Sequence, residues 1–185
     1  MNKKFTQTAV LAGICIMLTL TGLGFIRTPL LNVTIVHLPV ILGTLIVGKK
    51  QGLILGLVFG LCSLYQNLVA PSATSFVFYN PMVSIFPRVM IPVMMILTGK
   101  LLRKCNVKAR VIATSLVGSL TNTVLVLSMI YVFFAKDYAT ALGVSTNAVV
   151  GVLLTTACTN GIAEAVIVSI ISLAIVKAMK KDLAI

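Results

Sequence analysis

The sequence is poor in the side chains that most enzymes use for chemistry. Its 185 residues include three acidic residues, Asp137, Glu164 and Asp182, and one histidine, His37. A carboxylate pair, a Ser-His-Asp set or a carboxylate-rich metal site is hard to assemble from so few groups. We therefore expect no enzymatic activity, no metal site and no other cofactor.

Cysteine is also sparse, and its spacing carries no motif. Cys15, Cys62, Cys105 and Cys158 form no CxxC pair and have no histidine close by in the sequence. Three of the four lie inside apolar runs. This placement is typical of small buried apolar side chains, and it argues against a disulfide framework or a zinc site.

Charge of either sign is scarce, and apolar residues take its place. Charged residues make up 10% of the chain, against about 25% in soluble domains. Hydrophobic residues make up 59%, and the mean hydropathy is +1.12. This composition suits lipid as the solvent and excludes a water-soluble enzyme. No segment resembles a separate soluble domain, so residues 1–185 are expected to form a single membrane domain.

Long apolar runs predict the architecture. A helix needs about 20 apolar residues to cross a bilayer core of about 30 Å. Six runs approach that length, the second being short: residues 6–26, 33–47, 51–69, 81–102, 111–134 and 148–176. Arg27, Thr28 and Pro29 are expected to end the first helix, and Asn80 before Pro81 to begin the fourth. We predict an all-α membrane protein with a bundle of six transmembrane helices.

Basic residues are segregated between the loops. With six spans, one side of the membrane receives Lys3, Lys4, Lys49, Lys50, Lys100, Arg103, Lys104, Lys108, Arg110, Lys177, Lys180 and Lys181. The opposite side receives only Arg27 and Lys136. The excess of lysine and arginine marks the cytoplasmic side, so both termini are expected in the cytoplasm of a multi-pass cell-membrane protein. The net charge of +12 then needs no nucleic-acid partner.

Arg88 is the one basic residue inside a predicted span, about 10 Å from its outer end. A charge at that depth is costly and usually meets a partner or a cavity. Glu164, the one acid inside a span, is expected about 24 Å down, which is about 14 Å deeper. A salt bridge between the two is the weaker alternative. We favour an anion, such as a substrate carboxylate, bound by Arg88 in an outward-facing cavity.

Amides and hydroxyls are expected near the depth of Arg88. Asn122 lies near the middle of the fifth span, and Asn160 shares a helical face with Thr156 and Glu164. Tyr79 and Asn80 lie beside the fourth span. Together they predict a pocket for a small, polar, anionic molecule, although each could instead bond neighbouring helices. His37 is expected to be a satisfied interfacial side chain, with a ligand contact as the alternative.

Small residues recur at helical spacing on two spans. Gly52, Gly56 and Gly60 share one face of the third span, and Ala9 and Gly13 share one face of the first. Such faces allow another backbone to approach closely. They indicate either packing within the bundle or docking of another subunit.

The chain resembles the substrate-binding S components of energy-coupling factor (ECF) vitamin transporters. The resemblance covers almost the whole chain and is carried by residues 34–63, with the run HLPVILGTLIVGKKQGLILGLVFGLCS. The segments from Asn80 to Arg88 and from Gly118 to Val124 are most similar to the pantothenate-specific branch.

The resemblance implies high-affinity capture of a vitamin outside the cell and its delivery inward. The partners would be an ECF transmembrane coupling subunit and two ABC-type ATPases. For pantothenate, Arg88 would hold the carboxylate and Asn122 the amide or a hydroxyl, with Asn80, Tyr79 and Asn160 as further ligand contacts. Glu164 would lie too deep for the pocket. Docking would use Ala9 and Gly13, with help from Gly52, Gly56 and Gly60, and residues 27–34 would form a lid.

Other functions remain open at this point. The chain could bind a different vitamin or precursor, such as a thiamin pyrimidine or a folate-like molecule, although a neutral ligand would leave Arg88 without a partner. It could also be a self-contained secondary carrier. That class is expected to show internal repeats and a proton relay, and neither is evident in the sequence.

Overall fold

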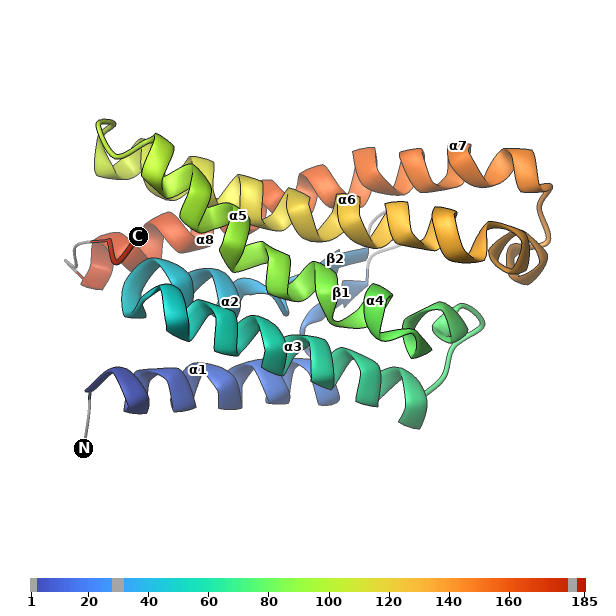
Figure 1. Ribbon diagram of the computed structural model, residues 1–185, viewed down its shortest axis with the longest axis horizontal. Coiled ribbons are helices and arrows are strands. Elements are labelled where there is room, and N and C mark those ends of the chain that lie inside the picture. Colours follow the sequence, from blue (N-terminus) through green and yellow to red (C-terminus); the bar gives the residue numbers. More distant parts are fainter. Residues whose placement is uncertain (1–2, 28–31, 180–182) are drawn as a thin grey trace.

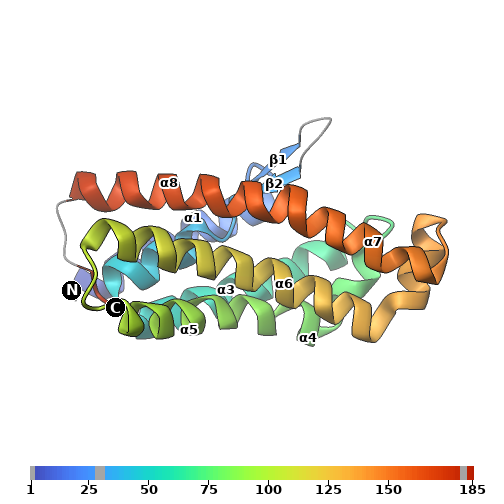
Figure 2. The same ribbon diagram turned by 90° about the horizontal axis from the view of Figure 1, so that it is seen from above.

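The computed structural model describes residues 3–27, 32–179 and 183–185, which form a helical bundle with one small β-hairpin (Figure 1). The beginning of α1 and the segment 183–185 lie at the same end of the bundle (Figures 1 and 2). In chain order the elements are α1 (Lys3–Leu20), β1 (Phe25–Arg27), β2 (Asn32–Thr34), α2 (Leu38–Leu42), the π-helix η1 (Gly43–Val47), α3 (Lys49–Val69), the 3-10 helix η2 (Ser75–Tyr79), α4 (Pro81–Ser84), α5 (Phe86–Leu101), α6 (Val107–Leu142), α7 (Thr146–Thr156), the π-helix η3 (Ala157–Gly161) and α8 (Ile162–Met179).

Five helical stretches of the described chain are long and apolar enough to cross a membrane. They are α1, α3, the α4–α5 run Pro81–Leu101, α6, and the run Thr146–Met179. The prediction of apolar spans is confirmed for these five. The second predicted span is different, because its apolar helix covers only Leu38–Val47, about 15 Å of rise. Its first two residues, Val33 and Thr34, belong to the strand β2 (Asn32–Thr34) instead.

The connection after the first helix is a hairpin. α1 ends at Leu20, and Gly22 then takes a φ of 72°, which glycine adopts without strain. β1 pairs antiparallel with β2, with Phe25 opposite Thr34, and the hairpin stands out from the bundle beside α8 (Figure 2). The prediction that the first helix reaches Ile26 and ends at Arg27-Thr28-Pro29 was therefore wrong. Thr28 and Pro29 lie outside the described residues.

Two helix boundaries at the end of the bundle away from the beginning of α1 can be compared with the sequence prediction, and one of the two agrees. Asn80 caps α4 as expected, since its Oδ1 accepts a hydrogen bond from the Met82 amide at 2.9 Å. α6, however, passes its predicted end at Phe134 and continues to Leu142. Phe134 has non-helical backbone angles (φ −136°, ψ 17°), so the helix kinks there rather than ending. Gly143, with a φ of 67°, ends it.

The glycine row of α3 packs inside the bundle. Gly52, Gly56 and Gly60 are all buried. A methyl group built on Gly56 would lie 2.7 Å from the carbonyl oxygen of Arg88, and one on Gly60 would lie 2.8 Å from the Cα of Ile85. These glycines let α3 approach α5 closely at the level of Arg88. Their face is occupied by the chain's own helices, so their assignment to subunit docking is not carried further.

Alanine at Gly56 is expected to destabilise the protein, because its methyl group has no room against the α5 backbone. Overpacking of this kind costs roughly 1–3 kcal/mol. Gly151 on α7 is the matched control, since nothing lies within 4 Å of a methyl group built there. Gly151→Ala should leave stability unchanged or raise it by up to about 1 kcal/mol through helix propensity. Thermal unfolding in detergent measures both; equal melting temperatures would contradict the close packing of α3 on α5.

Candidate functional site

A polar cavity of about 400 Å³ lies within the bundle, in the size range of small-molecule sites. Residues from both halves of the chain form its walls. They are Thr19, Thr34, Phe59, Ser63, Gln66, Asn67, Ala70, Ser72, Ser75, Phe78, Arg88, Asn122, Thr123, Val126, Leu127, Thr156, Asn160, Gly161 and Glu164.

Arg88 is held firmly in the wall of this cavity. Its side chain is 6% exposed. One terminal nitrogen donates to the carbonyl oxygen of Val83 at 2.6 Å, and the other to Ser63 Oγ at 3.3 Å. The guanidinium carbon also lies 5.5 Å from the ring centre of Phe59 and 5.6 Å from that of Phe78. Two aromatic faces and two acceptors thus fix the cation without neutralising its charge.

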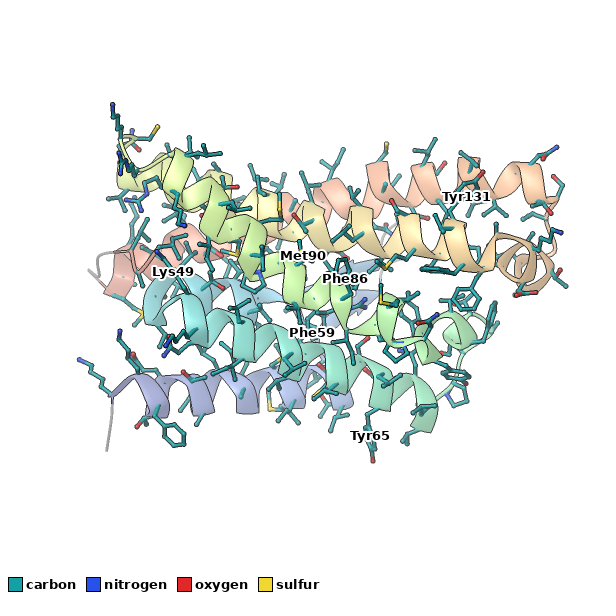
Figure 3. The ribbon with its side chains drawn as sticks, viewed as in Figure 1. Lys49, Phe59, Tyr65, Phe86, Met90 and Tyr131 are labelled. Carbon is teal, nitrogen blue, oxygen red and sulfur yellow. The ribbon has the colours of Figure 1, made fainter. Side chains whose placement is uncertain are left out.

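Proline explains why the Val83 carbonyl is available. In a regular helix that carbonyl would accept from the amide of residue 87, but Pro87 has no amide hydrogen. The helix breaks at Ile85 between α4 and α5, and the Arg88 guanidinium bonds the freed oxygen instead. Phe59, at the centre of the bundle in Figure 3, lies on the same face of α3 as Ser63.

Two buried polar atoms in the cavity wall have no partner among the described residues. They are Arg88 Nε, a donor, and Asn122 Oδ1, an acceptor. A buried polar group without a hydrogen bond costs about 1–3 kcal/mol. The protein therefore does not use the full hydrogen-bonding capacity of Arg88 and Asn122, two residues that line the cavity. A cation and an amide in one wall suit a small molecule with a carboxylate and an amide or hydroxyl group.

The five candidate ligand contacts from the sequence separate into two groups. Arg88, Asn122 and Asn160 line the cavity. Tyr79 and Asn80 are absent from its lining; Tyr79 is 43% exposed, and the Asn80 side chain caps α4. We therefore do not carry these two residues into the site. Tyr65, in the last two turns of α3, points away from the bundle (Figure 3).

Glu164 is the main residue that the sequence placed wrongly. It lines the same cavity as Arg88, is 7% exposed, and accepts a hydrogen bond from the backbone amide of Thr34 at 2.7 Å. Thus the carboxylate is bound to β2 of the hairpin. Within the described chain, Arg88 and Glu164 form no ion pair, although both line the cavity.

The C-terminal half of α3 contributes residues that the sequence did not single out. Ser63 and Phe59 precede Asn67 at steps of four residues and contact Arg88. Asn67 itself has a structural role, donating to the Ser63 carbonyl at 2.8 Å and accepting from Ser75 Oγ at 2.7 Å. Phe59, Ser63 and Asn67 are spaced four residues apart, so they share one face of the helix. That spacing could have predicted Phe59 and Ser63 as residues of the site.

His37 is a buried core side chain rather than an interfacial one. It is 0% exposed, and its Nε2 lies 3.0 Å from Ser119 Oγ on α6. It is not part of the cavity lining. The described residues also contain no group of three histidine, cysteine or acidic side chains that could hold a metal ion.

The small residues of α1 lie on the outside of the bundle. Ala9 and Gly13 are exposed, and a methyl group built on Gly13 would have no neighbour within 4 Å. Large apolar side chains surround them on the same helix, including Phe5, Val10 and Met17. This apolar face of α1 is open to lipid or to another protein.

Comparison with known proteins gives two findings. The family model described as "ECF transporter, substrate-specific component" matches residues 3–176. The chain is also similar to the "Pantothenic acid transporter PanT" of Lactococcus lactis subsp. cremoris (strain MG1363). The two are 31% identical over 162 residues, which covers 80% of this chain and 78% of that protein.

Proposed function

The chain belongs to the family of substrate-specific components of ECF transporters, and we propose that it captures pantothenate in the cavity beside Arg88 for uptake into the cell. The observation that carries the choice of an anionic ligand is the buried Arg88 guanidinium, which faces a polar cavity without an ionic partner among the described residues. The similarity to a pantothenic acid transporter supports this particular anion.

Pantothenate carries the groups that the wall lacks. Its carboxylate would be the acceptor for the Arg88 guanidinium, which lines the cavity. Its amide group would bond the Asn122 side chain in the same wall. Phe59 and Phe78 flank the guanidinium and exclude water from that end of the site, which strengthens the ion pair. Neutral ligands, such as a thiamin pyrimidine, would leave the buried cation unpaired.

We propose that the protein has six transmembrane helices with both termini in the cytoplasm. The short Leu38–Val47 helix would be the second crossing, completed on the outer side by the chain around β2. Basic residues lie at the beginnings of α1, α3 and α6 and at the ends of α5 and α8. These positions would all be on the cytoplasmic side, which supports this orientation under the positive-inside rule. The cavity and the hairpin would then belong to the outer half of the bundle.

Delivery into the cytoplasm requires an energy source outside this chain. We propose that the protein acts with an ECF transmembrane coupling subunit and two ABC-type ATPases in the cell membrane, as membership of the family implies. Ala9 and Gly13 are the proposed docking residues, because α1 presents them on an exposed apolar face where another helix can approach closely.

The binding proposal is tested by isothermal titration of the purified protein in detergent. Pantothenate should bind at one site with submicromolar affinity, while a thiamin pyrimidine and a folate-like compound should give no heat of binding. Failure of pantothenate to bind, or tighter binding of another compound in this panel, would contradict the assignment.

A further inference from the structure

The cavity has a second charged wall that the proposed pantothenate contacts do not use. α5 carries Arg88 and α8 carries Glu164, and both helices pack against α6 (Figure 2). The two residues line one cavity, yet no ion pair joins them in the described chain. The site therefore has a cationic part and an anionic part, on different helices.

Glu164 is held in place by protein contacts and retains capacity to accept more. Its Oε1 receives the Thr34 amide at 2.7 Å, and the side chain is 7% exposed. A carboxylate offers about four acceptor positions, so the bonds from the backbone amide and the side chain of Thr34 leave part of that capacity free. Thr156 and Asn160 line the same wall and precede Glu164 at steps of four residues, which makes this part of the cavity polar.

We propose that Glu164 is a specificity-determining residue that accepts hydrogen bonds from the hydroxyl groups of the ligand. This inference rests on the proposed function. With the pantothenate carboxylate at Arg88 and its amide at Asn122, the two hydroxyl groups extend toward the opposite wall, where Glu164 is the charged acceptor. The same carboxylate repels a second negative charge, so the site favours a ligand that is anionic at one end and a hydroxyl donor at the other.

The bond to Thr34 gives Glu164 its orientation before the ligand arrives. A carboxylate already fixed by a backbone amide loses little side-chain freedom when a hydroxyl group binds it. Glutamine at this position keeps the shape, and its oxygen can still accept from Thr34, but the negative charge is lost. Glu164→Gln should therefore keep the bond to the hairpin and remove the charge that would bind the ligand, so the two effects can be measured separately.

The test combines one variant with one altered ligand. The ligand is the pantothenate analogue in which hydrogen replaces both hydroxyl groups, leaving the carboxylate and amide unchanged. Glu164→Gln should weaken pantothenate binding by about ten- to a hundredfold, as expected for loss of hydrogen bonds to a charged group. It should leave the affinity for the dideoxy analogue unchanged, which also shows that the variant is folded. Asp137→Asn, which removes an exposed carboxylate at the far end of α6, should affect neither ligand.

Two results would overturn the inference while leaving the proposed function intact. In one, the wild type binds pantothenate and Glu164→Gln binds it equally well. In the other, the variant loses affinity for both ligands by the same factor, which assigns Glu164 to the structure alone. Absence of pantothenate binding by the wild type would instead overturn the proposed function, and this inference with it.

Discussion

Replacing Arg88 with alanine is expected to weaken pantothenate binding by about 100-fold or more. The variant removes the buried cation that the ligand carboxylate would meet, and breaking a buried hydrogen-bonded charge pair costs about 2–5 kcal/mol. The two aromatic rings at 5.5 and 5.6 Å and the 2.6 Å bond to Val83 hold the guanidinium in one position. The wild-type site therefore needs little rearrangement on binding. Removal of the guanidinium should accordingly appear as a lower affinity for pantothenate. Isothermal titration in detergent measures it.

Arg88→Lys is the informative companion variant. Lysine keeps the positive charge but lacks the planar set of donors with which arginine can bond the Val83 carbonyl and a carboxylate at the same time. Its affinity should lie between those of the wild type and the alanine variant. Melting temperatures measured without ligand identify any variant that has lost its fold. If folded Arg88→Ala binds pantothenate with an affinity within threefold of the wild type, Arg88 does not bind the carboxylate, and the proposed contact is wrong.

Leucine at Gly13 is expected to abolish pantothenate uptake by cells while leaving the affinity of the purified protein unchanged. Gly13 is exposed on α1 with open space around it, so a leucine side chain fits without disturbing the bundle. The same side chain would block close approach of another helix to the face that holds Ala9. Uptake of labelled pantothenate in cells that contain the ECF module, beside titration of the purified variant, separates the two effects.

Gly151→Leu is the matched control for this experiment. Gly151 lies on α7, is exposed, and also has no neighbour within 4 Å of an added methyl group. The same substitution is thus made on a different face of the molecule, and uptake should continue at the wild-type rate. Normal uptake by the Gly13→Leu variant would rule out this face of α1 as the docking surface. Uptake by the purified wild type alone in liposomes would favour a self-contained carrier.

The sequence predicted the membrane class and the most informative side chain for clear physical reasons. A chain with 59% hydrophobic residues and separate apolar runs has few folds open to it, because lipid leaves the backbone no hydrogen-bond partners except its own. Arg88 was identified because a charge within an apolar run is costly and therefore rarely incidental. Asn122 and Asn160 followed from helical spacing and depth.

Glu164 was misplaced because depth was counted from predicted helix ends. α6 continues through a kink at Phe134 to Leu142, about 12 Å farther than the apolar run alone predicts. The turn into α7 consequently extends past η2 (Figure 1), and Glu164 is less deep than a count from Ala148 suggests. The π-helix at Ala157–Gly161 is a further departure from regular helix geometry that periodicity does not predict.

The roles of the glycine row, the hairpin and Asn80 depend on contacts between elements that the sequence does not show. The spacing of Gly52, Gly56 and Gly60 predicts one small-residue face correctly, but the sequence does not say what covers it. Thr44 of η1 covers Gly52, and the backbone from Ile85 to Val89 covers Gly56 and Gly60. The sequence predicts that Phe25 and Ile26 end one apolar span and that Val33 and Thr34 begin the next, because both pairs adjoin apolar runs. In the structure these residues pair with one another as strands. Asn80 has a helix-capping signal, and capping is its role.

Recognition of the carboxylate by Arg88 is tested most directly by changing the ligand and leaving the protein intact. Pantothenol differs from pantothenate in having an alcohol in place of the carboxylate, while its amide and other hydroxyl groups are the same. The wild-type protein should bind pantothenate with submicromolar affinity and pantothenol at least about 100-fold more weakly. Equal affinity for the two compounds would contradict the account, because the buried arginine would then have no part in selecting the ligand.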